Sequence, residues 1–183
     1  MKNEWEEKIQ SEFPFMKQTG NSNDNTYRRW GFECSGGWYE LLRDCCQQIT
    51  DRYKKAGIEI DFVPVQVKEK FGTLRFYYEF EDAPLKIAAF DFIGSCSVRF
   101  EPGNKADNEI KKIFRHDIAT IIRAAEERSK HTCEHCGKEG VLRKDLGWIR
   151  TLCDECYDER IKAIENNKKK RAENKQEDYI GSC

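Results

Sequence analysis

The chain has 183 residues and nine cysteines, and its 32 Lys and Arg residues nearly balance its 33 Asp and Glu residues. This length accommodates one ordinary domain with a small appended module, and it excludes two full-sized domains. The first residues lack the basic start and apolar run of a secretory signal, and no stretch approaches the roughly 18 apolar residues of a membrane span. We therefore expect a soluble cytoplasmic protein whose cysteines are thiols and metal ligands rather than disulfides.

The charge is balanced along the chain as well as in total. Residues 131–183 contain 11 basic and 11 acidic side chains, which leaves 21 and 22 in residues 1–130. Neither part is basic, so the composition disfavours a sequence-independent grip on a phosphate backbone.

The first half of the chain predicts a helix, a loop, a second helix and a hairpin. Residues 3–13 can form a short helix, which Pro14 and a polar run end. Residues 37–56 predict a longer helix, because apolar side chains recur at steps of three and four and Gly57 follows as a C-terminal cap. Residues 58–80 alternate β-branched and aromatic residues with polar ones around the sequence KEKFG, which predicts a β-hairpin.

The second strand of this hairpin separates into two faces, because successive side chains of a strand point in opposite directions. Its apolar face would hold Leu74, Phe76, Tyr78 and Phe80. In the first strand, the Val63-Pro64 step interrupts the alternation and predicts a bulge or an edge position.

Residues 81–105, which follow the hairpin, fit two kinds of secondary structure. They can form one more strand at the sequence SCSVRFE, with a short helix before it. A long helix capped by Asp107 should follow and run into the cysteine-rich segment. Its apolar stripe would consist of Ile110, Ile113, Phe114, Ile118, Ile121, Ile122 and Ala125.

Four cysteines near the C-terminus have the spacing of a structural zinc site. They are Cys133, Cys136, Cys153 and Cys156. Two CxxC turns can bring four sulfur atoms onto one ion and complete a tetrahedron. Four thiolates leave no open position for water or substrate, so the expected zinc ion is structural, and His131 and His135 are not needed as ligands.

A cluster of cations on the hairpin is the candidate binding surface. We define the cationic face as Lys68, Lys70, Arg75 and Tyr77. Positive charge beside aromatic rings suits a phosphate, a nucleotide or an acidic peptide. The alternative is a solvated sheet face whose lysines only discourage pairing with other strands.

The predicted fold class is α+β. Residues 1–130 would form a core domain, a small antiparallel sheet packed by two main helices. Residues 131–160 would form a zinc-ribbon-like module, here called the cysteine module. Residues 161–183 would form a charged tail that is helical or disordered.

Three motifs occur in order along the chain, namely GGWYELLRDCC, VQVKEKFGTLRFYYEF and CEHCGKEG. In them the chain resembles a group of small uncharacterised bacterial and bacteriophage proteins with a GW-type helix start, a VKEKFG-x-LRFY hairpin and a C-terminal CxxCG zinc knuckle. The resemblance covers roughly residues 31–80 and 120–157. It implies a phage or prophage setting and names no reaction.

These observations favour a non-catalytic, zinc-stabilised binding protein that engages a host protein or sequesters a small anionic ligand. One alternative is a nucleic-acid-binding zinc ribbon, which the run NKKKRAENK favours and the charge balance opposes. The other alternative is an enzyme whose site is assembled from residues distant in sequence. No phosphate-binding glycine loop is present, and the one histidine outside the module, His116, lies within a predicted helix.

Overall fold

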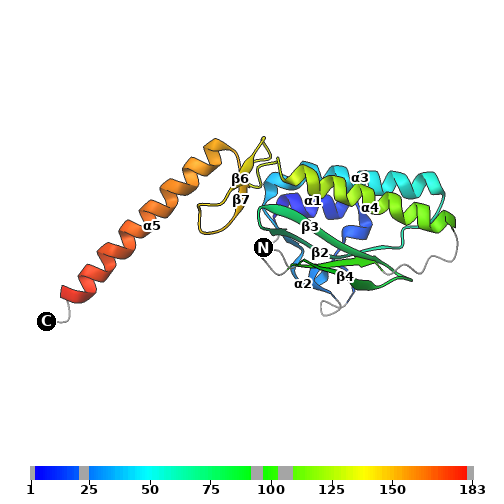
Figure 1. The fold of residues 1–183 in the computed structure, drawn as a ribbon, viewed down its shortest axis with the longest axis horizontal. Helices are drawn as coiled ribbons and strands as arrows, with labels where there is room; N and C mark the ends of the chain where they lie inside the picture. The colour runs from blue at the N-terminus through cyan, green and yellow to red at the C-terminus, as the bar shows by residue number, and fades with distance from the viewer. Residues whose placement is uncertain (1–2, 21–24, 92–96, 103–108, 181–183) are drawn as a thin grey trace.

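The chain forms an α+β fold in the computed structural model, which describes residues 3–20, 25–91, 97–102 and 109–180 (Figure 1). The α-helices are α1 (Glu4–Glu12), α2 (Thr26–Trp30), α3 (Tyr39–Ala56), α4 (Glu109–Ser129) and α5 (Asp154–Ile180), and short 3₁₀ turns are η1 (Pro14–Met16) and η2 (Gly36–Trp38). The strands are β1 (Phe32–Glu33), β2 (Phe62–Lys70), β3 (Thr73–Phe80), β4 (Leu85–Asp91), β5 (Ser97–Pro102), β6 (Val141–Arg143) and β7 (Arg150–Leu152).

The main sheet has the order β1-β2-β3 and is mixed rather than purely antiparallel, which corrects the sequence-based expectation. The short strand β1 pairs parallel to β2, with Phe32 opposite Val67 and Glu33 opposite Lys68. A parallel pair needs a crossover connection, and α3 provides it. The sequence did not indicate β1, because two residues are too few to show an alternating pattern.

The β2–β3 hairpin confirms its predicted pattern. Leu74, Phe76, Tyr78 and Phe80 are buried, and the residues between them are partly exposed. The register shifts between Pro64 and Gln66, which is the bulge expected near the Val63-Pro64 step. Phe71 and Gly72 form the turn, with φ angles of 55° and 75°.

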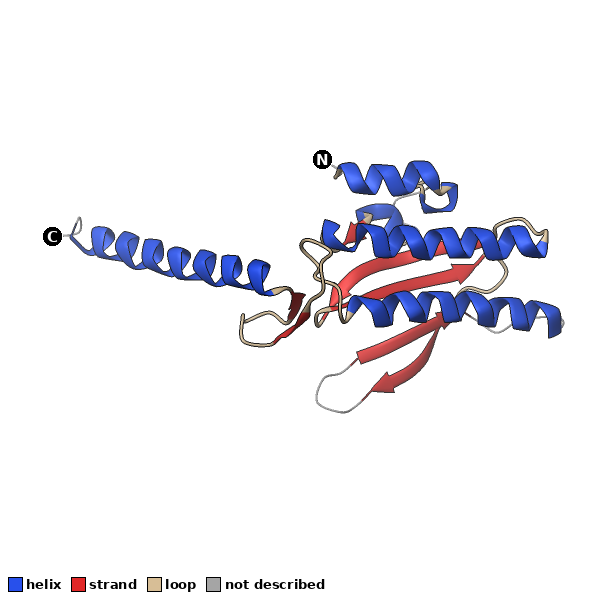
Figure 2. Ribbon diagram, turned by 90° about the horizontal axis from the view of Figure 1, so that it is seen from above, coloured by secondary structure: helices blue, strands red, loops and turns tan. Residues whose placement is uncertain are grey.

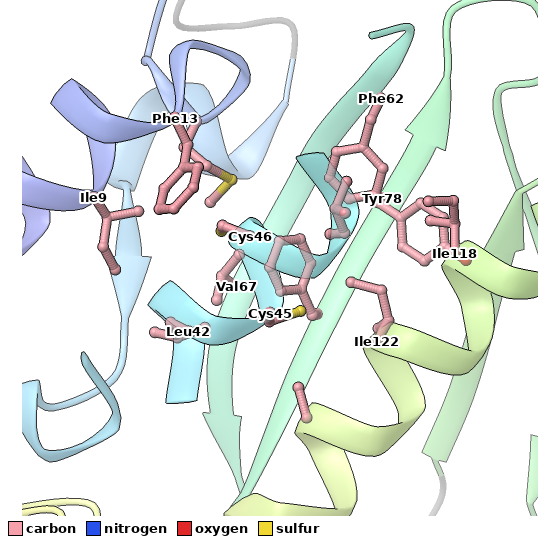
Figure 3. Packing of buried hydrophobic residues seen from close by; sticks show 14 of the residues in the cluster. Ile9, Phe13, Leu42, Cys45, Cys46, Phe62, Val67, Tyr78, Ile118 and Ile122 are labelled. Atoms are coloured by element: carbon pink, nitrogen blue, oxygen red, sulfur yellow. The ribbon is translucent and has the colours of Figure 1, made fainter. Parts of the chain in front are cut away.

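Helices α1, α3 and α4 cover one face of the sheet (Figures 1 and 2). Their apolar side chains point toward β2 and β3 and form one continuous core (Figure 3). The predicted helix at residues 37–56 is observed as η2 and α3, and Gly57 caps it with φ 66°.

The predicted apolar stripe of α4 is wrong in its first turn. Ile110 and Ile113 are 80% and 59% exposed, whereas Phe114, Ile118 and Ile122 are buried. Arg115 takes a buried position there, because its guanidinium lies 4.5 Å from the centre of the Phe80 ring and pairs with Asp82. The expected cap at residue 107 lies outside the described residues.

Helix α4 also closes the outer edge of β3. The hydroxyl of Ser129 accepts a hydrogen bond from the Leu74 N–H at 2.8 Å, and a carboxylate oxygen of Glu126 accepts one from the Phe76 N–H at 3.0 Å. Unpaired N–H groups on an edge strand invite pairing with another chain. At these two positions, side chains of α4 take the place of a neighbouring strand.

We expect Ser129→Ala to lower the free energy of unfolding by about 1–3 kcal/mol, because a buried N–H loses its acceptor. Urea denaturation measures this effect. Thr120→Ala is the control. The hydroxyls of Ser129 and Thr120 each donate to a helix carbonyl, but Thr120 lies on the exposed side of α4, so its replacement should cost less than about 0.5 kcal/mol. Equal losses in the two variants would contradict the edge-closing role of Ser129.

The segment between the hairpin and α4 contains two paired strands. β5 agrees with the strand expected at SCSVRFE, but β4 occupies the place where a short helix was expected. The two strands form a separate two-stranded sheet, and β5 lies next to β3.

The cysteine module lies at one end of the core domain, and α5 extends from it away from the rest of the molecule (Figure 1). The predicted tail, which could have been helical or disordered, is helical as far as Ile180. Its side chains from residue 165 to 171 are exposed. No helix in the described part of the chain is both long and apolar enough to cross a membrane.

Candidate metal centre and cationic face

The four cysteines of the module come together at one point. The first pair follows α4 directly, and the β6–β7 hairpin returns the chain so that Cys153 and Cys156 flank the start of α5. All four sulfur atoms lie within 4.8 Å of one another, and those of Cys136 and Cys153 are 3.6 Å apart. A tetrahedral ion with metal–sulfur bonds of about 2.3 Å requires separations of about 3.8 Å, so the donor set fits a metal ion.

Backbone N–H groups around the cluster favour the thiolate form of Cys133. Burial opposes ionisation of Cys133, but the N–H groups of Cys153, Cys136 and His135 hold the pKa of this thiol below its usual value. At Cys156, burial and then the neighbouring thiols raise the pKa. A cluster of four thiols therefore needs a cation before all of its members can ionise.

The two histidines of the module have different positions. The cluster contains neither histidine, although Nδ1 of His135 lies 3.7 Å from the sulfur of Cys156. Four sulfur ligands already complete a tetrahedron, so the geometry does not require His135 as a ligand.

The first CxxC turn is joined to the start of α3. The Gly37 N–H donates to the Glu134 carbonyl at 2.9 Å, and the indole N–H of Trp38 donates to the Thr132 carbonyl at 2.9 Å. A Cβ atom on Gly37 would lie 2.4–2.6 Å from three backbone atoms of this turn, so only glycine allows this approach. The module is therefore bound to the core domain by backbone contact.

Glu134 strengthens this junction from inside the first CxxC sequence. Its side chain is buried, and one carboxylate oxygen accepts hydrogen bonds from the N–H and the hydroxyl of Ser35. The other oxygen accepts from the Arg150 guanidinium at 3.1 Å. The Glu134 carboxylate thus links Ser35 of the core domain to Arg150 on β7 of the module.

The second contact joins the module to the tip of the β2–β3 hairpin. The Thr151 hydroxyl donates to the Gly72 carbonyl at 2.7 Å, and the Trp148 indole donates to a carboxylate oxygen of Glu69 at 2.9 Å. The GGW, KEKFG and CEHCG motifs therefore meet at one junction. Sequence reasoning missed this junction, although the glycine in each motif was a signal of close backbone approach.

The four residues of the cationic face share one side of the hairpin. Lys68 and Arg75 are directly opposite each other on neighbouring strands. The ammonium group of Lys68 lies 5.7 Å from the centre of the Tyr77 ring. The ammonium group of Lys70 lies 5.4 Å from the centre of the Phe71 ring. Within the described residues, none of the three cations forms an ion pair.

The surroundings of Lys68 disfavour the charged form of its ammonium group. Burial lowers the pKa of its ammonium group, and Lys70 lowers it further, while Glu33 on the neighbouring strand acts in the opposite direction. The Glu33 carboxylate also accepts a hydrogen bond from Gln66. An added anion would stabilise the charged form of Lys68.

The described cysteines outside the module are poor nucleophiles. Burial raises the pKa of the Cys45 thiol to about 12, and it also raises the pKa values of Cys34 and Cys46. Since the thiolate is the reactive form, these three side chains are packing residues.

The fold and the site together define an α+β protein with a small mixed sheet and a four-cysteine site compatible with a metal ion. No family model matches the chain, and neither the curated proteins nor the solved structures that were compared with it give a match.

Proposed function

We propose that this chain is a non-catalytic binding protein in which a structural zinc ion holds a cationic face in place. Four cysteine ligands in a tetrahedral arrangement are typical of structural zinc, and they leave no position for substrate. The ion would fix the cysteine module against the hairpin tip. The cationic face would then accept an anionic group of the partner.

The like-charged pair of Lys68 and Arg75 is the observation that carries this proposal. Directly opposite like charges destabilise a β-sheet. Glu33 lies opposite Lys68 on β1, yet within the described residues no carboxylate comes within ion-pair distance of either cation. Protection of a sheet edge does not account for the pair, because β2 is the central strand and α4 closes β3 at Leu74 and Phe76. A local conflict that costs stability is typical of functional sites.

We expect Arg75→Glu to stabilise the fold and to weaken anion binding. The new carboxylate would pair with Lys68, which should raise the free energy of unfolding by about 0.5 kcal/mol. Inorganic pyrophosphate, titrated while amide shifts are recorded by NMR, should shift the amides of β2 and β3 in the wild-type protein. Its affinity should fall at least tenfold in the variant.

Arg123→Glu is the matched control, because it makes the same change in charge on the exposed side of α4. It should leave pyrophosphate binding unchanged. If Arg75→Glu bound pyrophosphate as tightly as the wild-type protein, or if pyrophosphate shifted no hairpin amide, the cationic face would not be a binding site.

The resemblance to phage proteins suggests the setting in which this function would operate. In that setting, the partner would be a host protein or a small anionic ligand in the cytoplasm, where thiols remain reduced and available to zinc. Nucleic acid is the less favoured partner, because the protein has no excess of positive charge to bind a phosphate backbone.

A further inference from the structure

An exposed apolar patch lies where the hairpin tip meets the cysteine module. We define it as Phe71, Leu142 and Trp148, which are 43%, 43% and 60% exposed. A methyl group of Leu142 reaches the space beside Gly72, and the Trp148 indole is bonded to Glu69, so both side chains flank the turn that carries Phe71. Side chains from two segments far apart in the sequence therefore lie around one hairpin turn.

Phe71 is unfavourable for folding in two respects. Its φ of 55° lies in the left-handed region, where a bulky side chain is strained and where asparagine or glycine is preferred in a two-residue hairpin turn. Its ring is also partly exposed to solvent. Neither feature stabilises the hairpin, which indicates that the ring has another use.

The apolar patch and the cationic face meet at Phe71. Lys70 precedes Phe71 and places its ammonium group over the ring, and Lys68 and Arg75 follow along the same face of the hairpin. A ligand that covers the apolar patch would therefore present its flanking groups to three cations. Complementarity requires those groups to be negatively charged.

We propose that the apolar patch and the cationic face together bind a protein segment in which an aromatic or aliphatic side chain is flanked by carboxylates. This inference rests on the proposed function and names its partner class. Exposed tryptophan, phenylalanine and arginine are typical of the centres of protein interfaces. An aliphatic side chain such as Leu142 offers no ring for a base to stack on, and three cations give little salt-dependent affinity for a nucleic acid.

The patch is held rigidly, which reduces the ordering cost of binding. One oxygen of the Glu69 carboxylate accepts from the Gly72 N–H, and the other accepts from the Trp148 indole. The Thr151 hydroxyl holds the Gly72 carbonyl from the other side. The proposed ion in the cysteine module would keep this arrangement fixed before the partner arrives.

Selection from a library of short random peptides, with the full-length zinc-loaded protein as bait, tests the proposal. We expect the enriched peptides to contain an aromatic or leucine residue between aspartates or glutamates. A labelled peptide of this kind should bind at least tenfold more weakly to Trp148→Ala and to Phe71→Asn. Phe71→Asn should also raise the melting temperature by about 2–4 °C, because Asn-Gly suits this turn.

Trp30→Ala is the matched control, since Trp30 is 62% exposed at the end of α2 and outside the apolar patch, and it should bind the peptide normally. The proposal would be overturned by a lack of acidic–apolar enrichment, or by peptides that bind both patch variants as well as wild type. Tighter binding of labelled oligothymidylate, lost in the same variants, would assign the surface to nucleic acid instead. Pyrophosphate shifts that persist while peptides fail would overturn this inference alone and leave the proposed function standing.

Discussion

Replacing Cys153 by serine is expected to abolish binding of the proposed zinc ion and to unfold the cysteine module together with the adjoining end of the core domain. Cys153 follows β7, whose Thr151 holds the Gly72 carbonyl, so movement of this strand reaches the hairpin tip. Structural zinc contributes most of the folding free energy of small modules. We expect the variant to lose about 5 kcal/mol or more, a large part of the stability of a typical domain.

Two measurements check this expectation. Native mass spectrometry should find one zinc ion in the wild-type protein and none in Cys153→Ser. In amide NMR spectra of the variant, the signals of Gly37 and Gly72 should change along with those of residues 131–153, because both glycines contact the module.

His135→Ala is the control for this variant. Its ring lies beside Cys156, yet four sulfur ligands suffice, so the variant should retain one ion and nearly full stability. Loss of the ion from His135→Ala would show that the histidine is a ligand. A Cys153→Ser protein whose Gly37 and Gly72 signals were unchanged would show instead that the module unfolds independently of the core domain.

The features that sequence predicted correctly depend on short-range patterns. The helix at residues 37–56 has its own periodicity and its own cap at Gly57, and the hairpin has alternating residues on both sides of one turn. The four cysteines could be grouped because CxxC spacing is itself a local geometric constraint. In each case, the residues that determine the structure lie within one short segment of the chain.

The features that sequence missed depend on distant partners. Strand β1 exists because α3 carries the chain back to β2, and Arg115 is buried through its contacts with Phe80 and Asp82 while Ile110 and Ile113 are exposed. Likewise, a boundary after residue 130 was a natural inference from the cysteine spacing. The backbone contacts of the module with Gly37 and Gly72 could be seen only in three dimensions.

Replacing Gly37 by alanine should be nearly as damaging as losing a cysteine, although Gly37 touches no metal. A Cβ atom there would lie 2.4 Å from the Glu134 carbonyl oxygen, 2.5 Å from that of Cys133 and 2.6 Å from the Cys136 nitrogen. These are backbone atoms of the first CxxC turn, so no change of side-chain rotamer can relieve the overlap. Either α3 or the two ligands of this turn must move.

We expect Gly37→Ala to lower the free energy of unfolding by about 3 kcal/mol and to weaken zinc binding in competition with a chelating dye. Gly36→Ala is the matched control, because the three atoms nearest to its Cβ all belong to the Trp5 side chain, at 2.9–3.6 Å, and none is a backbone atom. It should cost about 1 kcal/mol or less and leave zinc affinity unchanged. If the two variants behaved alike, the contact between Gly37 and the CxxC turn would not couple the metal site to the core domain. A selective loss of zinc affinity in Gly37→Ala would show that the helix start and the metal site form one structural unit, because no ligand has been altered.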